Sequence, residues 1–331
     1  MSTQFALYLK DVDVVHLLAF VGGFIDSAGY LRLLGVFTSS ITGNLVVATA
    51  SVASMRGVIC RSFVCVAFFF SGVVAAGISL RLRLAHGLSQ RLVCCLVFGL
   101  EIAFIVASWI IGHYYDEVML LNTDIDLWIN VLVGCLLGAS MGFHNVAAKE
   151  AITNCPPTTV MTSTMINVAQ NLSNTVEYAL ATVSFLRLQP TTDPLTDAQK
   201  VSMRAKYIDS RGKFFTTAKP LFWFIVGCII GAITMDRGSW HSFAIPCAAL
   251  LLLVTDALLQ LQVTIAATAT AAAVQVEQSL ELERQKEKVP EVQNGNGAIG
   301  TYQKLPVEEG QQYGSSTAIT STQQGEAKDR V

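Results

Sequence analysis

Phe24-Ile-Asp26-Ser-Ala-Gly29, with Thr38-Ser-Ser-Ile-Thr42-Gly43-Asn44 after it, is the stretch of sequence that decides the fold. The same order of an apolar segment and a Thr-rich motif returns in the second half of the chain, as Phe143-His144-Asn145 and then Thr158-Thr-Val-Met-Thr162-Ser163-Thr164. Polar groups are costly inside apolar segments, so two such motifs indicate a shared role. The repetition predicts two halves of the protein that face one common site.

The composition indicates the surroundings of the chain. Of its 331 residues, 52% are hydrophobic and 14% are charged, and the mean hydropathy of +0.51 lies outside the range of soluble globular proteins. Six apolar stretches approach the roughly 17 to 25 residues that span a bilayer as a helix. They are 14–31, 62–80, 92–112, 127–148, 220–235 and 238–255. We therefore expect an all-α integral membrane protein with about six transmembrane helices.

Several classes of function are disfavoured. The formal net charge of -2 and the lack of a basic, aromatic-rich patch argue against nucleic acid as a partner. The eight cysteines form no CxxC pair and show no Cys/His spacing suited to zinc. We interpret most of them as small packing side chains, and we expect no metal site and no cofactor. Residues 1–13 lack the basic start and the cleavage site of a signal peptide.

The charged loops predict the orientation. Residues 81–91 hold three arginines and no acid, whereas 113–126 hold four acids and no Lys or Arg. The positive-inside rule makes 81–91 cytosolic and 113–126 an acidic outer loop. The polar loop 187–219 carries seven Lys or Arg, so this loop, the helix extension 264–290 and both termini are expected in the cytosol. Residues 291–331, rich in Gln, Gly, Ser and Thr, are expected to form a disordered tail.

This orientation requires that the segments after the two motifs, 41–53 and 159–185, do not cross the membrane. The first has the length of a re-entrant segment, and the second holds too many Asn and Gln residues to face lipid. The prediction is a 3+3 inverted repeat, with units 14–112 and 127–263 in opposite orientation, a plan that recurs in transporters. The alternative, with eight spans, places the arginines of 81–91 outside.

Candidate site residues follow from this plan. We assign a substrate pathway between the repeats to eight residues of the two motifs: Asp26, Thr42, Gly43, Asn44, His144, Asn145, Thr162 and Thr164. Three carboxyl groups on predicted spans are hypotheses for proton or ion coupling, because a charge in the bilayer is costly: Asp26, Glu101 and Asp256. A structural role stays open for each of them. Asp26 would then hydrogen-bond to the turn near Thr42.

Glycines at regular spacing predict close helix packing, either within the chain or between copies of it: Gly134, Gly138, Gly142, Gly227 and Gly231. Gly138-Ala-Ser140-Met-Gly142 also matches the Gly-x-Ser-x-Gly motif of hydrolases. A nucleophile elbow needs a strand, a sharp turn and a helix, which the interior of an apolar span does not offer. We therefore expect no enzyme activity.

With these motifs in view, the chain resembles the YoaK family, membrane proteins grouped as domain of unknown function 1275. The resemblance covers about 12–263. It rests on three matches: Ala19-Phe-Val-Gly-Gly-Phe-Ile-Asp26-Ser-Ala-Gly29, Gly35-Val-Phe-Thr-Ser-Ser-Ile-Thr42-Gly43-Asn44, and Met141-Gly-Phe-His144-Asn145 with Thr158-Thr-Val-Met-Thr162. It implies about six spans and no established activity.

The sequence departs from the family pattern at His144, where Gln is usual, and at Ser163, where Gly is usual. Both positions remain polar, but substrate specificity need not be shared. The long loop and the tail are typical of a eukaryotic, fungal-type member.

Two hypotheses of function remain. The leading one is a small-solute transporter or channel with a midplane site between inverted repeats. The alternative is a membrane scaffold or assembly factor that acts through its cytosolic loop and tail. The expected partners are the lipid bilayer, an unidentified small solute and a second copy of the chain.

Overall fold

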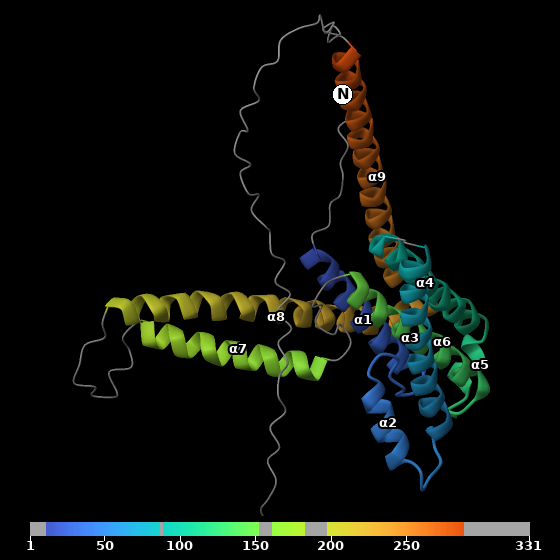
Figure 1. Ribbon diagram of the computed structural model, residues 1–331. Helices are drawn as coiled ribbons and strands as arrows, with labels where there is room; N and C mark the ends of the chain where they lie inside the picture. The colour runs from blue at the N-terminus through green and yellow to red at the C-terminus, as the bar shows by residue number, and fades with distance from the viewer. Residues whose placement is uncertain (1–10, 87–88, 152–160, 183–196, 288–331) are drawn as a thin grey trace, which may run out of the picture. The chain divides into compact units, whose positions relative to one another are not determined.

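Every regular element in the described part of the chain is a helix (Figure 1). This computed structural model describes residues 11–86, 89–151, 161–182 and 197–287. The elements are α1 (Asp11–Arg32), α2 (Ile41–Ala50), α3 (Val58–His86), α4 (Gln90–Tyr114), α5 (Asp116–Leu121), α6 (Trp128–Ala151), α7 (Met161–Thr182), α8 (Asp197–Gly238), the 3-10 helix η1 (Ser239–Phe243) and α9 (Ala244–Glu287). The predicted all-α membrane fold is confirmed. The tail 291–331 and the N-terminal residues 1–10 lie outside the described residues.

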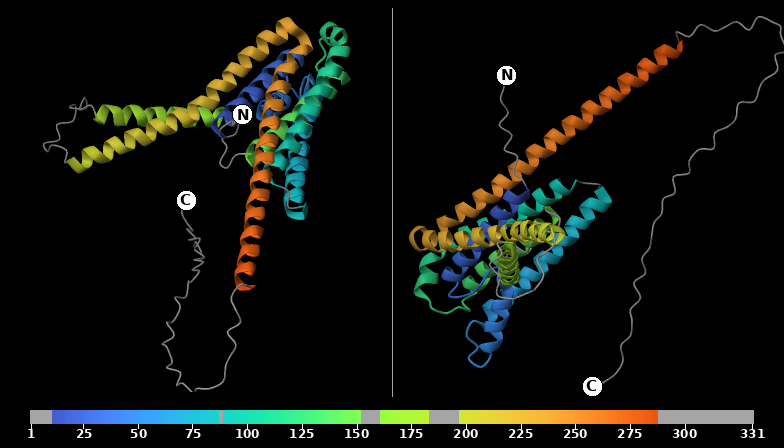
Figure 2. Two further views of the ribbon diagram at one scale, coloured as in Figure 1. Left: turned by 90° about the horizontal axis from the view of Figure 1, so that it is seen from above. Right: turned by 90° about the vertical axis from the view of Figure 1, so that its left-hand side faces the viewer.

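Five helical stretches of the described chain are long and apolar enough to cross a membrane. They are Asp13–Arg32, Val58–Leu84, Leu92–Tyr114, Trp128–Glu150 and Arg204–Glu281. The last stretch contains both α8 and α9, and the chain turns sharply at η1 between them (Figure 2). It therefore offers two crossings, in agreement with the six apolar stretches of the sequence. Residues up to Val274 form one compact unit, and the helical end of α9 belongs to a second one.

The two predicted re-entrant segments differ in length. α2 has 10 residues, a length of about 15 Å, so it is too short to cross a hydrocarbon core of about 30 Å. α7 has 22 residues but is not apolar enough to count among the candidate spans. Its exposed apolar residues recur at Met165, Leu172 and Val176, as expected for an amphipathic helix.

The predicted polar loop 187–219 is helical from Asp197 onward, as the first half of α8. Polarity alone suggested a loop, but this stretch is rich in Lys, Arg and Ala, which favour helix. Lys213 and Asp209 also form an i,i+4 ion pair of 2.7 Å. Pro220 lies inside α8 without ending it.

Two helix pairs meet in closely similar ways, α1 with α8 and α3 with α6. A Cβ on Gly23 of α1 would lie 2.2 Å from the backbone oxygen of Phe224 and 3.2 Å from the nitrogen of Cys228. A Cβ on Gly142 of α6 would lie 2.5 Å from the backbone oxygen of Phe68 and 3.0 Å from the nitrogen of Gly72. Each glycine therefore touches the partner's backbone over one helical turn.

The other predicted packing glycines also lie at these two contacts. Gly227 and Gly231 of α8 face the backbone oxygens of Phe20 and Phe24. On α6, Gly134 and Gly138 lie against Val64 of α3. These glycines are therefore used within the chain, where small residues let membrane helices approach closely.

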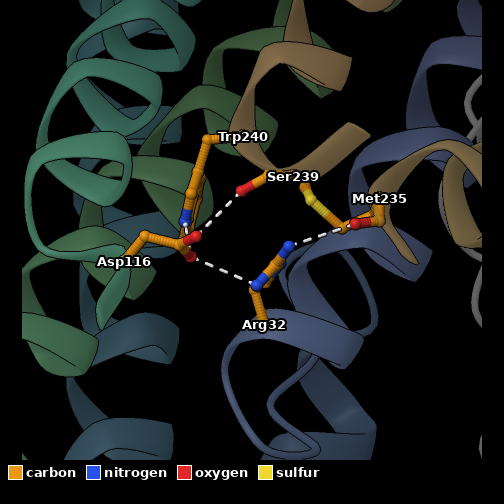
Figure 3. A network of polar contacts seen from close by, with 5 residues as sticks. All are labelled: Arg32, Asp116, Met235, Ser239 and Trp240. Atoms are coloured by element: carbon orange, nitrogen blue, oxygen red, sulfur yellow. Dashed lines mark hydrogen bonds and ion pairs between the residues drawn. The ribbon is translucent and has the colours of Figure 1, made fainter. Parts of the chain in front are cut away.

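One carboxylate joins three parts of the chain at the end of the helices where α5 lies, here called the α5 end (Figure 3). Asp116 accepts hydrogen bonds from Arg32 at 3.1 Å, from Trp240 Nε1 at 2.8 Å and from Ser239 at 3.0 Å. Arg32 also donates to the backbone oxygen of Met235 at 3.1 Å. The network connects α1, α5 and the α8–η1 turn.

A second carboxylate at the α5 end caps α3. Asp126 accepts from the backbone N–H groups of Gly57 at 2.7 Å and Cys60 at 2.8 Å, which lie at the start of that helix. Arg61 is buried and donates to the backbone oxygens of Gly35 and Gly57. Two of the acids and one of the arginines at this end therefore have structural roles.

Replacing Gly142 with Ala should lower the free energy of unfolding by about 1 to 3 kcal/mol, because the new methyl group would overlap the α3 backbone. Gly77→Ala is the matched control, since a Cβ at that position meets no atom within 4 Å. Thermal or denaturant unfolding in detergent micelles measures both effects. Equal stability of the two variants would contradict the close contact between α3 and α6.

Candidate functional site

Asp26 holds the non-helical stretch between α1 and α2 in place. Its Oδ1 accepts hydrogen bonds from the backbone N–H of Thr38 at 2.9 Å and of Ser39 at 2.8 Å. Its Oδ2 accepts from the hydroxyl of Ser40 at 2.6 Å, and Thr38 Oγ1 donates back to the oxygen of Ile25 at 3.1 Å. The carboxylate therefore satisfies backbone donors that would be costly to leave unpaired inside a membrane. The structural role that the sequence left open for Asp26 is present.

Asn44 braces the same stretch from α2. Its side-chain oxygen accepts from the backbone N–H of Phe37 at 2.9 Å, and its side-chain nitrogen donates to the oxygen of Phe37. Asn44 is fully buried, so its amide binds the polypeptide rather than lining an open space. Gly29 lies beside Thr38, whose methyl group would be 2.4 Å from a Cβ there. A residue with a side chain at that position would push the stretch away from α1.

A pocket of about 780 Å³ lies beside this stretch, and we call it the Asp26 pocket. It is lined by Asp26, Ser27, Tyr30, Phe37, Ser39, Ser40, Ile41, Thr42, Gly43, Phe68, Met165, Phe224 and Cys228. Its walls combine aromatic rings with a small number of hydroxyl groups, as is typical of small-molecule sites. α1, α2, α3, α7 and α8 all contribute to it.

Three of the sequence-predicted pathway residues, Asp26, Thr42 and Gly43, line the Asp26 pocket. The pocket includes no residue of the second motif itself among the described residues, but it includes Met165, which follows Thr164 in α7. Thr164 itself is buried. The side chain of Thr162, like all of Thr158, lies outside the described residues.

The sequence did not identify the aromatic wall. The rings of Tyr30 and Phe37 pack in a tilted arrangement with 4.8 Å between their centroids, and Phe68 and Phe224 come from α3 and α8, outside the motifs. Phe68 and Phe224 are also the residues whose backbone oxygens face Gly142 and Gly23, contacts that only the structure shows.

His144 lies elsewhere, paired with Glu101. His144 Nδ1 and Glu101 Oε1 are 2.8 Å apart, and both side chains are fully buried between α6 and α4. Within the described residues, Glu101 Oε2 and His144 Nε2 make no hydrogen bond. A buried acid–imidazole pair can hold a proton on either partner. His144, predicted for the substrate pathway, and Glu101, predicted for coupling, therefore form a buried pair that does not line the Asp26 pocket.

Two further predicted residues, Asn145 and Asp256, lie on α6 and α9. Asn145 donates to the oxygen of Met141 at 2.8 Å, and Asp256 accepts from Gln260 at 2.7 Å, in each case one turn away on the same helix. Ser140 donates to Leu137 at 2.7 Å in the middle of α6, which is the helical context expected for the Gly-x-Ser-x-Gly sequence. In the described part of the chain, no cluster of His, Cys, Asp and Glu could hold a metal ion.

Asp26→Ala should lower the free energy of unfolding by about 2 to 5 kcal/mol, because the N–H groups of Thr38 and Ser39 lose a charged acceptor. Hydrogen exchange at these two amides should accelerate. Ser27→Ala, next to it and also lining the pocket, should change stability by no more than about 0.5 kcal/mol. Unchanged exchange in Asp26→Ala would show that the carboxylate does not hold the stretch.

A double-mutant cycle tests the buried pair. Glu101→Leu or His144→Leu alone leaves one buried polar group unpaired and should cost about 3 to 5 kcal/mol. The double Leu variant should cost less than the sum of the two, since an apolar pair needs no partner. Unfolding in mixed micelles measures all three variants. Strict additivity would mean that the two side chains do not interact.

Comparison with known proteins identifies the family of the chain. The family profile described as "Protein of unknown function (DUF1275)" matches residues 14–256. The UPF0700 transmembrane protein YoaK of Bacillus subtilis (strain 168) is 26% identical over 175 residues, which cover 53% of this chain and 72% of that protein. No solved structure matches. The matched region contains the Asp26 pocket and the Glu101–His144 pair, and the chain belongs to the DUF1275 family of transmembrane proteins.

Proposed function

We propose that this protein moves a small solute across the membrane and that the Asp26 pocket is its binding site. The observation that carries the proposal is the composition of the pocket wall. Residues of the first motif, Asp26 and Thr42, share it with Met165, the residue that directly follows the second motif in the other half of the chain. A cavity between the two halves of a membrane bundle is where transporters bind their substrates.

The two glycine contacts support the inverted-repeat part of the proposal. Gly23 and Gly142 occupy matching positions before Phe24 and Phe143, and each meets the second long helix of the other half. α2 and α7 likewise each pack on the long helix that follows them in sequence, α3 and α8. Two inverted repeats are expected to make equivalent contacts with each other in this way.

Proton coupling is assigned in this proposal to Glu101 and His144 rather than to Asp26. The Asp26 carboxylate already accepts hydrogen bonds from three residues of the α1–α2 stretch, which gives it a structural role. The Glu101–His144 pair is fully buried, and each partner has one polar atom still unsatisfied within the described residues. Such a pair is suited to binding and releasing a proton.

Transport is tested with the full chain in proteoliposomes, by following light scattering after mixing with a panel of neutral, anionic and cationic small solutes. Thr42→Trp should sharply reduce the permeability to any solute that the wild type admits, because the new ring enters the Asp26 pocket. Leu84→Trp is the matched control, because Leu84 of α3 is exposed on the surface of the protein and does not line the pocket. Permeability equal to that of protein-free vesicles for the whole panel would favour the scaffold hypothesis.

The coupling assignment has its own test. For a transported solute, Glu101→Gln should remove the pH dependence of the rate between about pH 5 and 8, whereas Asp26→Asn should retain it. The reverse result would return the coupling role to Asp26.

A further inference from the structure

The side chains around the Asp26 pocket include an acid and no base. Of the thirteen residues that line it, Asp26 is the one carboxylic acid, and none is Lys, Arg or His. In the part of the chain that the structure describes, Asp26 forms no ion pair with a basic side chain. The buried Arg61 donates instead to the backbone oxygens of Gly35 and Gly57. The pocket wall therefore carries a carboxylate that has no basic partner.

The start of α2 also borders this pocket, and it works against an anionic solute. A helix N-terminus carries about half a positive charge, which would by itself attract an anion. Here Asp26 already accepts hydrogen bonds from the N–H groups of Thr38 and Ser39 and from the hydroxyl of Ser40, just before the helix. The charge of a carboxylate exceeds that of the helix end. An anion would meet this carboxylate and would find the nearby donors already in use.

Aromatic rings form much of the remaining wall. They come from α1, from the stretch before α2, from α3 and from α8: Tyr30, Phe37, Phe68 and Phe224. The face of an aromatic ring attracts a cation within about 6 Å of its centre, and several rings together bind quaternary ammonium groups. A neutral solute could use the rings, but only a cation could use the rings and the carboxylate.

The size of the pocket distinguishes an organic cation from a bare metal ion. Its volume of about 780 Å³ is typical of sites for small molecules. A metal ion such as Ca²⁺ requires about six to eight oxygen ligands close around it. No group of three His, Cys, Asp or Glu residues in the described part of the chain could hold a metal ion. The pocket is therefore better suited to a larger and weakly hydrated cation.

We propose that the Asp26 pocket selects small organic cations of the alkylammonium class. Asp26 supplies the opposite charge, and the rings of Phe68 and Phe224 supply an apolar surface that also attracts the cation. The inference rests on the proposed function, because it names the class of solute that the same pocket binds.

Three probes of nearly the same size and shape isolate the effect of charge. Choline carries a trimethylammonium group, 3,3-dimethyl-1-butanol has carbon in place of the nitrogen and is neutral, and 3,3-dimethylbutanoate is an anion. Isothermal titration calorimetry measures their binding to the full chain in detergent. Choline should bind at least about tenfold more tightly than the alcohol, and the anion should bind most weakly. Equal or tighter binding of the alcohol, or binding of none of the three, would overturn the proposal.

Variants of the wall locate the binding site. Asp26→Asn keeps the size of the side chain and should weaken choline binding by roughly tenfold or more, with little effect on the neutral alcohol. Phe68→Leu and Phe224→Leu, which leave Asp26 intact, should each weaken choline binding by roughly fivefold to tenfold. Phe69→Leu is the matched control, since Phe69 is exposed and does not line the pocket. Gel filtration checks that each variant is folded. Equal losses in Phe68→Leu and Phe69→Leu would contradict the assignment.

The proteoliposome assay separates this inference from the transport proposal. Choline that binds with the expected preference but does not cross the membrane would retain the cation site and remove transport. Passage of neutral or anionic solutes that Thr42→Trp blocks, without any binding of choline, would retain transport and overturn the cation site.

Discussion

The structure depends on satisfying a short piece of irregular backbone that lies among membrane helices. Free N–H and C=O groups are costly to bury among membrane helices, so each of them needs a hydrogen-bond partner. Asp26 and Asn44 provide partners from the two flanking helices, and each binds backbone groups of residues 37–39. The carboxylate that we predicted as a transport residue binds Thr38, Ser39 and Ser40 and so connects α1 to the stretch before α2.

This arrangement also creates the Asp26 pocket. A short helix cannot fill the space that a full span would occupy, and the remaining volume is bordered by the hydroxyls of Ser40 and Thr42 and by aromatic rings. The rings of Tyr30, Phe37 and Phe224 give the pocket an apolar wall, and the hydroxyl groups can orient a bound molecule through hydrogen bonds. The short helix α2 and the stretch before it therefore also form the Asp26 pocket, on which the proposed function rests.

Glycine determines how closely the halves approach. At Gly23, Gly142 and Gly227 a β-carbon would lie closer to a neighbouring backbone oxygen than any van der Waals contact allows. Since helices in lipid gain little from apolar burial, close packing of this kind is a main source of their association. The Glu101–His144 pair lies between α4 and α6, where its 2.8 Å contact offsets part of the cost of burying both groups.

The sequence by itself determined the class of fold and the approximate spans, because hydrophobic length is a property of the chain alone. It also identified the packing glycines by their spacing. Only the tertiary structure decided which polar groups meet. His144 pairs with Glu101 from another helix, and the side chain of Asn44 hydrogen-bonds to the backbone of Phe37. Both contacts depend on how the helices are rotated and how far apart they lie, which the sequence does not show. The helical start of α8 was likewise missed, because charge content does not distinguish a polar loop from a polar helix.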